Sequence, residues 1–167
     1  MPGTAIVDTG PLAAWFRAND PFHGVTDRFF RGFDGVLVTT WAVVVEVTHL
    51  LRPEAQLLFL AWVRKGGLEV VDMGAADLEP IERLIAKYRD QPMDFADATL
   101  VLLADRTGVS DIITLDRRQF DVTDSVATGV SAICCPRPPG VTAAPADFLS
   151  VANSLPHLSA VNMHRHR

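Results

Sequence analysis

The stretch PMDFADATLVLLA, residues 92–104, places two aspartates at the start of a strongly apolar segment. Proline is tolerated in the first turn of a helix, so we expect a helix that begins at Pro92 and ends near Gly108. Asp94 and Asp97 are three residues apart and therefore lie on one face of this helix. The segment thus directs two carboxylates toward the same place.

Two interpretations of these aspartates are open. A carboxylate in the first turn of a helix is stabilised by the helix dipole by about 0.3–1 kcal/mol, so capping can account for Asp94. Asp97 lies further in, and its face continues through Leu100 and Val101 toward the core. A buried charge is costly unless it is paired or binds a metal ion. Asp97 therefore predicts a partner that other parts of the chain must supply.

Short apolar runs and amphipathic segments alternate along the rest of the chain. Strands are predicted at residues 5–7, 35–38, 68–71, 112–114 and 130–134, and helices from residue 9, from residue 22, at 40–52, 54–65 and 77–89, and from residue 92. Segment 40–52 is rich in β-branched residues, but its length and apolar spacing favour a helix. The alternation is typical of an α/β fold with a mostly parallel sheet.

The apolar spacing also predicts which side chains face the core. In the second helix Phe22, Val25 and Phe29 form the expected inner face, and helix 77–89 is expected to bury residues 78, 81, 84 and 85. The three tryptophans, at positions 15, 41 and 62, are expected in the core or in an interface, with no clear platform for stacking bases.

Composition limits the class of protein. The chain has 167 residues and a net charge of −5, and 49% of its residues are hydrophobic, which predicts one soluble domain. An acidic total argues against a generic nucleic-acid-binding surface but does not exclude a nucleic-acid enzyme. No apolar run approaches the roughly 20 residues that cross a bilayer, so we expect no membrane segment. The two cysteines are neighbours, which predicts a reducing, cytoplasmic compartment.

Three more acids occupy positions where a lone charge is out of place. Asp8 follows the first predicted strand, Asp116 follows the fourth, and Glu46 lies among valines. Carboxyl ends of parallel strands meet at one edge of a sheet, where functional groups gather. Carboxylates that meet there raise one another's pKa, and a divalent cation relieves the repulsion. Oxygen ligands suit Mg²⁺ or Mn²⁺, which can activate water for phosphodiester cleavage.

Each of these acids also has a simpler explanation. Asp8 can cap the helix that follows it, a role that Thr9 can also fill. Asp116 can be a turn residue, and Glu46 can lie on a helix surface beside His49. Scattered acids are common in any chain of this size, so their spacing alone does not establish a metal site.

Four motifs in order are more specific. The segments IVDTGPLAAWF, VVVEVTHLL, DFADATLVLLA and IITLDRRQF together resemble a PIN domain, and their surroundings are similar to those of the bacterial VapC-like toxin ribonucleases. The resemblance covers about residues 4–120. It implies a three-layer α/β/α fold and a Mg²⁺- or Mn²⁺-dependent endoribonuclease. It also implies an antitoxin partner whose tail blocks the acidic groove, and a homodimer.

The resemblance assigns roles to the matching residues. Asp8 and Asp97 are the principal metal ligands that it implies, Glu46 is the acid that completes the site, and Asp116 closes the pocket or binds a second ion. Asp94 is a less constant fifth acid. Two further roles are implied: a hydroxyl from Thr114, and RNA phosphate contacts from Arg117 and Arg118, for which solvated surface arginines are the alternative.

The end of the chain departs from the family pattern. Residues 1–135 are expected to form the nuclease domain, whereas residues 136–167 are rich in proline and match no family element. We expect this C-terminal segment to be a weakly ordered tail.

Two other functions compete with the nuclease. An α/β phosphatase would use Asp8 as a nucleophile, but the position two residues later is Gly10 rather than an acid. A degenerate PIN-like module would bind RNA or a protein partner without turnover. The presence of all four principal acids argues against degeneracy.

Overall fold

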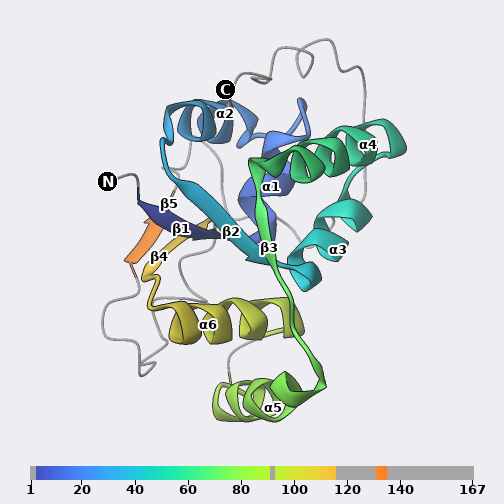
Figure 1. Cartoon of the computed structure of the whole chain (residues 1–167). Helices are drawn as coiled ribbons and strands as arrows, with labels where there is room; N and C mark the ends of the chain where they lie inside the picture. The colour runs from blue at the N-terminus through green and yellow to red at the C-terminus, as the bar shows by residue number, and fades with distance from the viewer. Residues whose placement is uncertain (1–2, 91–92, 116–130, 135–167) are drawn as a thin grey trace.

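The computed structural model describes residues 3–90, 93–115 and 131–134. Within these residues the chain forms one parallel sheet in the order β3-β2-β1-β4-β5 (Figure 1). The strands are β1 (Thr4–Val7), β2 (Val36–Thr40), β3 (Glu69–Val71), β4 (Asp111–Thr114) and β5 (Ser131–Cys134). Each neighbouring pair is parallel. The five predicted strands are confirmed, with ends that differ by a residue or two.

The strand order creates a switch point between β1 and β4. From β1 the chain moves outward to β2 and β3, and it then returns to the other side of β1 to form β4 and β5. In open parallel sheets, ligands bind outside the carboxyl ends of the strands at such a reversal. The residues that follow β1 and end β4 are therefore the first place to look for a functional site.

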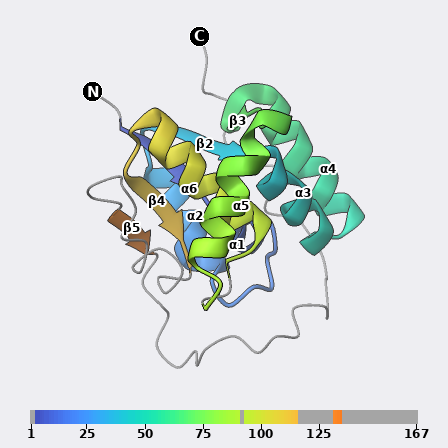
Figure 2. The same ribbon diagram turned by 90° about the horizontal axis from the view of Figure 1, so that it is seen from below.

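Helices lie on both sides of the sheet. They are α1 (Thr9–Trp15), α2 (His23–Gly32), α3 (Trp41–Leu50), α4 (Pro53–Trp62), α5 (Leu78–Lys87) and α6 (Phe95–Thr107), with short turns at Val63–Gly67 and Ala75–Asp77. In Figures 1 and 2, α6 covers one face with α5 outside it, and α1, α2 and α4 lie on the other side. Helix α3 contacts both α1 and α6, so it connects the two helical layers. The predicted three-layer α/β/α architecture is confirmed.

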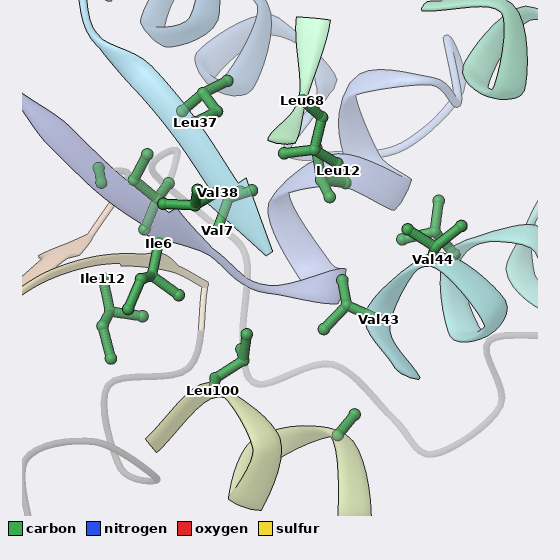
Figure 3. Packing of buried hydrophobic residues seen from close by; sticks show 14 of the residues in the cluster. Ile6, Val7, Leu12, Leu37, Val38, Val43, Val44, Leu68, Leu100 and Ile112 are labelled. Carbon is green, nitrogen blue, oxygen red and sulfur yellow. The ribbon is translucent and has the colours of Figure 1, made fainter. Parts of the chain in front are cut away.

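Helix α6 is buried on almost every side. Leu100 and Leu103 pack in the main core with Ile6, Val7 and Ile112 (Figure 3), whereas Ala98 and Leu102 face Ile81 of α5. A helix covered by a sheet on one face and by another helix on the other has no need of a polar stripe. Each fully buried leucine or isoleucine contributes about 1.5–3 kcal/mol, so this packing holds α6 firmly in place.

The predicted inner faces of α5 and α2 differ in detail from those of the structure. Leu78 is 51% exposed because α5 packs on one side only, against α6, whereas Ile81 is buried as predicted. In α2 the fully buried positions after Phe22 are Thr26 and Phe30, one residue later than predicted, and Val25 is only partly buried.

Helix α6 begins at Phe95 rather than at Pro92, because Asp94 adopts an extended backbone and caps the helix. Pro92 itself lies outside the described residues. No helix in the described part of the chain combines the length and apolarity needed to cross a membrane.

Candidate active site

The switch point of the sheet positions Asp8. This residue directly follows β1, and its backbone N–H donates to the carbonyl of Ile113 in β4 at 3.0 Å. Its carboxylate is fixed at both oxygens: the N–H of Thr9 donates to Oδ1 at 2.6 Å, and the hydroxyl of Thr114 donates to Oδ2 at 2.8 Å. The predicted cap of α1 is therefore present, but it uses only one of the two oxygens.

Glu46 reaches the same region from α3. The hydroxyl of Thr9 donates to its Oε2 at 2.7 Å, so Thr9 contacts Asp8 through its backbone and Glu46 through its side chain. Glu46 is half-buried and near His49, so it lies at the edge of the α3 surface while its carboxylate contacts Thr9. Sequence reasoning assigned Thr9 only a capping role. The signal that points to its second contact is a hydroxyl residue directly after the strand-terminal aspartate.

Asp94 and Asp97 form a reciprocal capping box at the start of α6. The N–H of Asp97 donates to Oδ1 of Asp94 at 2.9 Å, and the N–H of Asp94 donates to Oδ2 of Asp97 at 3.2 Å. Asp97 is 5% exposed, as expected from its apolar surroundings. Capping thus occupies one oxygen of each carboxylate. Among the described residues, Oδ1 of Asp97 accepts no side-chain or capping hydrogen bond.

The four carboxylates influence one another electrostatically. Burial, together with the charges of Asp94, Asp8 and Glu46, raises the pKa of Asp97 to about 7. Burial likewise raises the pKa of Asp8 to about 6, against the lowering effect of the Thr114 and Thr9 hydrogen bonds. The pKa of Glu46 is raised chiefly by burial, against the hydrogen bond from Thr9 and with a contribution from Asp94. Carboxylates this close to one another repel, which is the condition that a cation relieves.

The structure therefore brings together four of the predicted site residues, Asp8, Glu46, Asp94 and Asp97, with Thr114 supporting Asp8. The predicted fourth principal acid, Asp116, and the two arginines, Arg117 and Arg118, lie outside the described residues. Sequence reasoning could find the acids because each interrupts an apolar run or follows a strand.

The donor set fits a hard divalent cation. All the candidate ligands are oxygens, and the oxygens of Asp8 and Asp97 have lone pairs that their hydrogen bonds leave available. In the described part of the chain, no three Asp, Glu, His or Cys side chains are already arranged to hold an ion. Mg²⁺ is usually bound by only one or two carboxylates and keeps several waters, so a pair is sufficient.

Fold and site together define an α/β protein with a carboxylate pocket suited to a divalent cation at its switch point. Comparisons with known proteins identify the class. The family model described as PIN domain matches residues 5–125. Ribonuclease VapC26 of Mycobacterium tuberculosis (strain ATCC 25618 / H37Rv) is 35% identical over 128 residues, which cover 74% of this chain and 95% of the relative.

A solved structure agrees with the fold. The crystal structure of Mycobacterium tuberculosis VapC20, described as a sarcin-ricin loop cleaving toxin, matches with a TM-score of 0.64 at 23% identity, and the match covers 69% of this chain and 92% of that chain. The chain therefore belongs to the PIN-domain family, among its VapC-like ribonucleases. The resemblance predicted from four short motifs is confirmed.

Proposed function

We propose that this protein is a Mg²⁺- or Mn²⁺-dependent endoribonuclease that acts as the toxin of a type II toxin–antitoxin pair. The observation that carries the proposal is the cluster of Asp8, Glu46 and Asp97 at the switch point, in a chain 35% identical to Ribonuclease VapC26. Family membership favours cleavage of RNA over the phosphatase and binding-module alternatives. The cytoplasm supplies both the RNA and the reducing conditions that suit the chain.

Asp8 and Asp97 would hold the ion, with Asp116 as the third predicted ligand. When bound, a divalent cation stabilises charge on the reacting phosphate and lowers the pKa of water. Thr114 and Thr9 keep the carboxylate of Asp8 in one orientation, which a ligand geometry requires. The capping box does the same for Asp97.

Glu46 has a different role in this proposal. Its Oε2 accepts the Thr9 hydroxyl, which directs the side chain toward the other acids and leaves Oε1 able to accept a proton from the attacking water. Arg117 and Arg118 would contact RNA phosphates. These assignments follow from the resemblance and from the contacts of Glu46.

We also propose a homodimer and a cognate antitoxin as partners. The support is family membership together with the exposed leucines of α4, Leu57, Leu58 and Leu60, which a monomer leaves in water. Light scattering after size-exclusion chromatography tests the dimer, because the expected mass is twice the 18.2 kDa of one chain.

Cleavage of a mixed RNA pool tests the activity. Wild-type protein should cleave with Mg²⁺ or Mn²⁺ and should be inactive with EDTA. Asp97→Asn should abolish cleavage, whereas Asp105→Asn, the same change at an exposed position of α6, should leave it unchanged. If Asp97→Asn cleaves as fast as wild type, the site is wrong. Metal binding without cleavage of any RNA would favour the binding module.

A further inference from the structure

Helices α3 and α6 are in contact and lie near each other in Figure 1. A cleft is lined by residues of α3 and of the start of α6. Its volume is about 440 Å³, and it is lined by Trp41, Ala42, Val45, Glu46, Met73, Phe95, Ala96 and Thr99. Pockets that bind small rings are concave and mostly apolar, with a few polar groups that fix orientation. This cleft has that composition, with Glu46 and Thr99 as its polar members.

Three of the apolar side chains of the cleft are not part of the core. Trp41, Val45 and Phe95 are each about half exposed. All three tryptophans were expected in the core or in an interface. Trp15 is buried in the core, but Trp41 is not. The indole of Trp41 is held in place, because its Nε1–H donates to Oδ1 of Asp72 at 2.8 Å. A fixed, half-exposed aromatic ring provides a flat surface for another ring.

The cleft adjoins the cluster of acids through Glu46. Glu46 lines the cleft and also accepts the hydroxyl of Thr9, whose backbone N–H bonds Asp8. On the other wall, Phe95 and Ala96 lie between Asp94 and Asp97 in the sequence. A ligand in the cleft is therefore a direct neighbour of a phosphate in the acidic pocket.

Charge limits what the cleft can hold. The described residues that line it include no lysine, arginine or histidine, and the one ionisable residue among them is an acid. A phosphate or an acidic peptide would meet repulsion from Glu46 and no compensating cation in this lining. A flat, uncharged ring meets neither difficulty and gains contact with Trp41 and Phe95. Single-stranded RNA offers such rings, because an unstacked base can lie on an aromatic side chain.

We propose that this cleft binds one unstacked nucleobase of the RNA, next to the phosphate in the acidic pocket, with Trp41 as the stacking surface and Phe95 as the facing wall. The inference rests on the proposed ribonuclease function and adds a base-binding subsite to it. Stacking of one base on an aromatic side chain corresponds to a change of about 5- to 150-fold in binding.

The test uses the full chain and a short single-stranded RNA that spans a cleavage site mapped with the wild-type protein. Binding is measured in the Asp97→Asn background, so that the RNA stays intact. Trp41→Ala should raise Kd by about 5- to 150-fold, and Trp41→Phe should restore most of the affinity. Leu78→Ala, which removes a half-exposed apolar side chain from α5, is the matched control and should change Kd less than about twofold.

A set of RNAs with one abasic position each locates the base. Removal of the base at one position should weaken binding to the protein that retains Trp41 but not to the Trp41→Ala variant. This result is expected if that base and the indole of Trp41 interact with each other. Thermal unfolding of each variant shows that it is folded.

The outcomes separate the two proposals. If the wild-type protein cleaves RNA but Trp41→Ala binds it as tightly, or if no abasic position is coupled to Trp41, the base subsite is refuted and the ribonuclease stands. A smaller mass for Trp41→Ala with unchanged cleavage would assign the cleft to a second copy of the chain instead. If the wild-type protein neither binds nor cleaves RNA, the proposed function fails, and the subsite fails with it.

Discussion

Replacing Asp97 by asparagine should make the metal-free protein more stable. In the folded state Asp97 is buried and lies near the charges of Asp94, Asp8 and Glu46, which together raise its pKa from 3.8 to about 7. The folded state therefore binds a proton at pH values where the unfolded chain has lost it. The contribution of Asp97 to stability therefore falls as the pH rises from about 4 to about 7 and is lowest above that range. Asparagine stays uncharged at every pH, so the stability of the variant does not decrease in this way.

The size of the effect follows from the pKa and from the local contacts. A pKa that rises from 3.8 to about 7 corresponds to about 4 kcal/mol, which is an upper limit because nearby water screens the charge. Asparagine keeps the oxygen that accepts the Asp94 N–H, so the capping box survives. It loses the attraction between a carboxylate and the helix dipole, about 0.3–1 kcal/mol. We therefore expect a net gain of about 1–2 kcal/mol at pH 8 without metal.

Urea unfolding with EDTA at pH 4, 6 and 8 measures this gain. The difference between Asp97→Asn and wild type should be near zero at pH 4 and should grow toward pH 8, whereas Asp105→Asn should stay within about 0.5 kcal/mol at every pH. Adding Mg²⁺ at 100 times its Kd should stabilise wild type by about 2.7 kcal/mol and the variant far less. A variant that is less stable than wild type at pH 8, or a gain that does not change with pH, would refute the repulsion argument.

Four further substitutions test the rest of the structure. Thr114→Val removes the hydroxyl that donates to Asp8 and should lower the free energy of unfolding by about 1–3 kcal/mol in urea. Gly108→Ala places a side chain at a φ of 68°, so its melting temperature should fall by the equivalent of about 1 kcal/mol. Gly24→Ala, in a helix with open space around it, should instead be neutral or stabilising by up to about 1 kcal/mol in the same melts. Phe59→Ala empties a fully buried position and should cost about 3–5 kcal/mol by calorimetry.

The strands and the acidic site are accessible from the sequence because both depend on local contrasts. A strand stands out as a short apolar run between turn residues, and Asp8 stands out because it follows one. Asp97 and Glu46 stand out because each charge lies among apolar neighbours. The order of the strands in the sheet could not be predicted in this way, because hydrophobic periodicity does not indicate which strands are neighbours.

The missed features depend on contacts between distant segments. Leu78 has the spacing of a core residue, yet α5 has only one neighbouring layer and leaves it in water. Thr9 is an ordinary capping residue by sequence, and only the approach of α3 gives its hydroxyl a partner in Glu46. Trp41 is a large apolar residue of the kind that cores contain, but the buried positions of α3 are occupied by Val43, Val44 and Val47.

The two interpretations of Asp94 and Asp97 prove to be compatible in this structure. Capping uses Oδ1 of Asp94 and Oδ2 of Asp97, and these bonds fix the direction of both side chains. The remaining oxygen of Asp97 then lies within the influence of Asp8 and Glu46, where its charge is unfavourable without a cation. A cap alone would be better served by an exposed aspartate, because burial opposes its ionisation. The capping bonds at the start of α6 therefore stabilise this helix. The repulsion that remains between the carboxylates favours the binding of a cation.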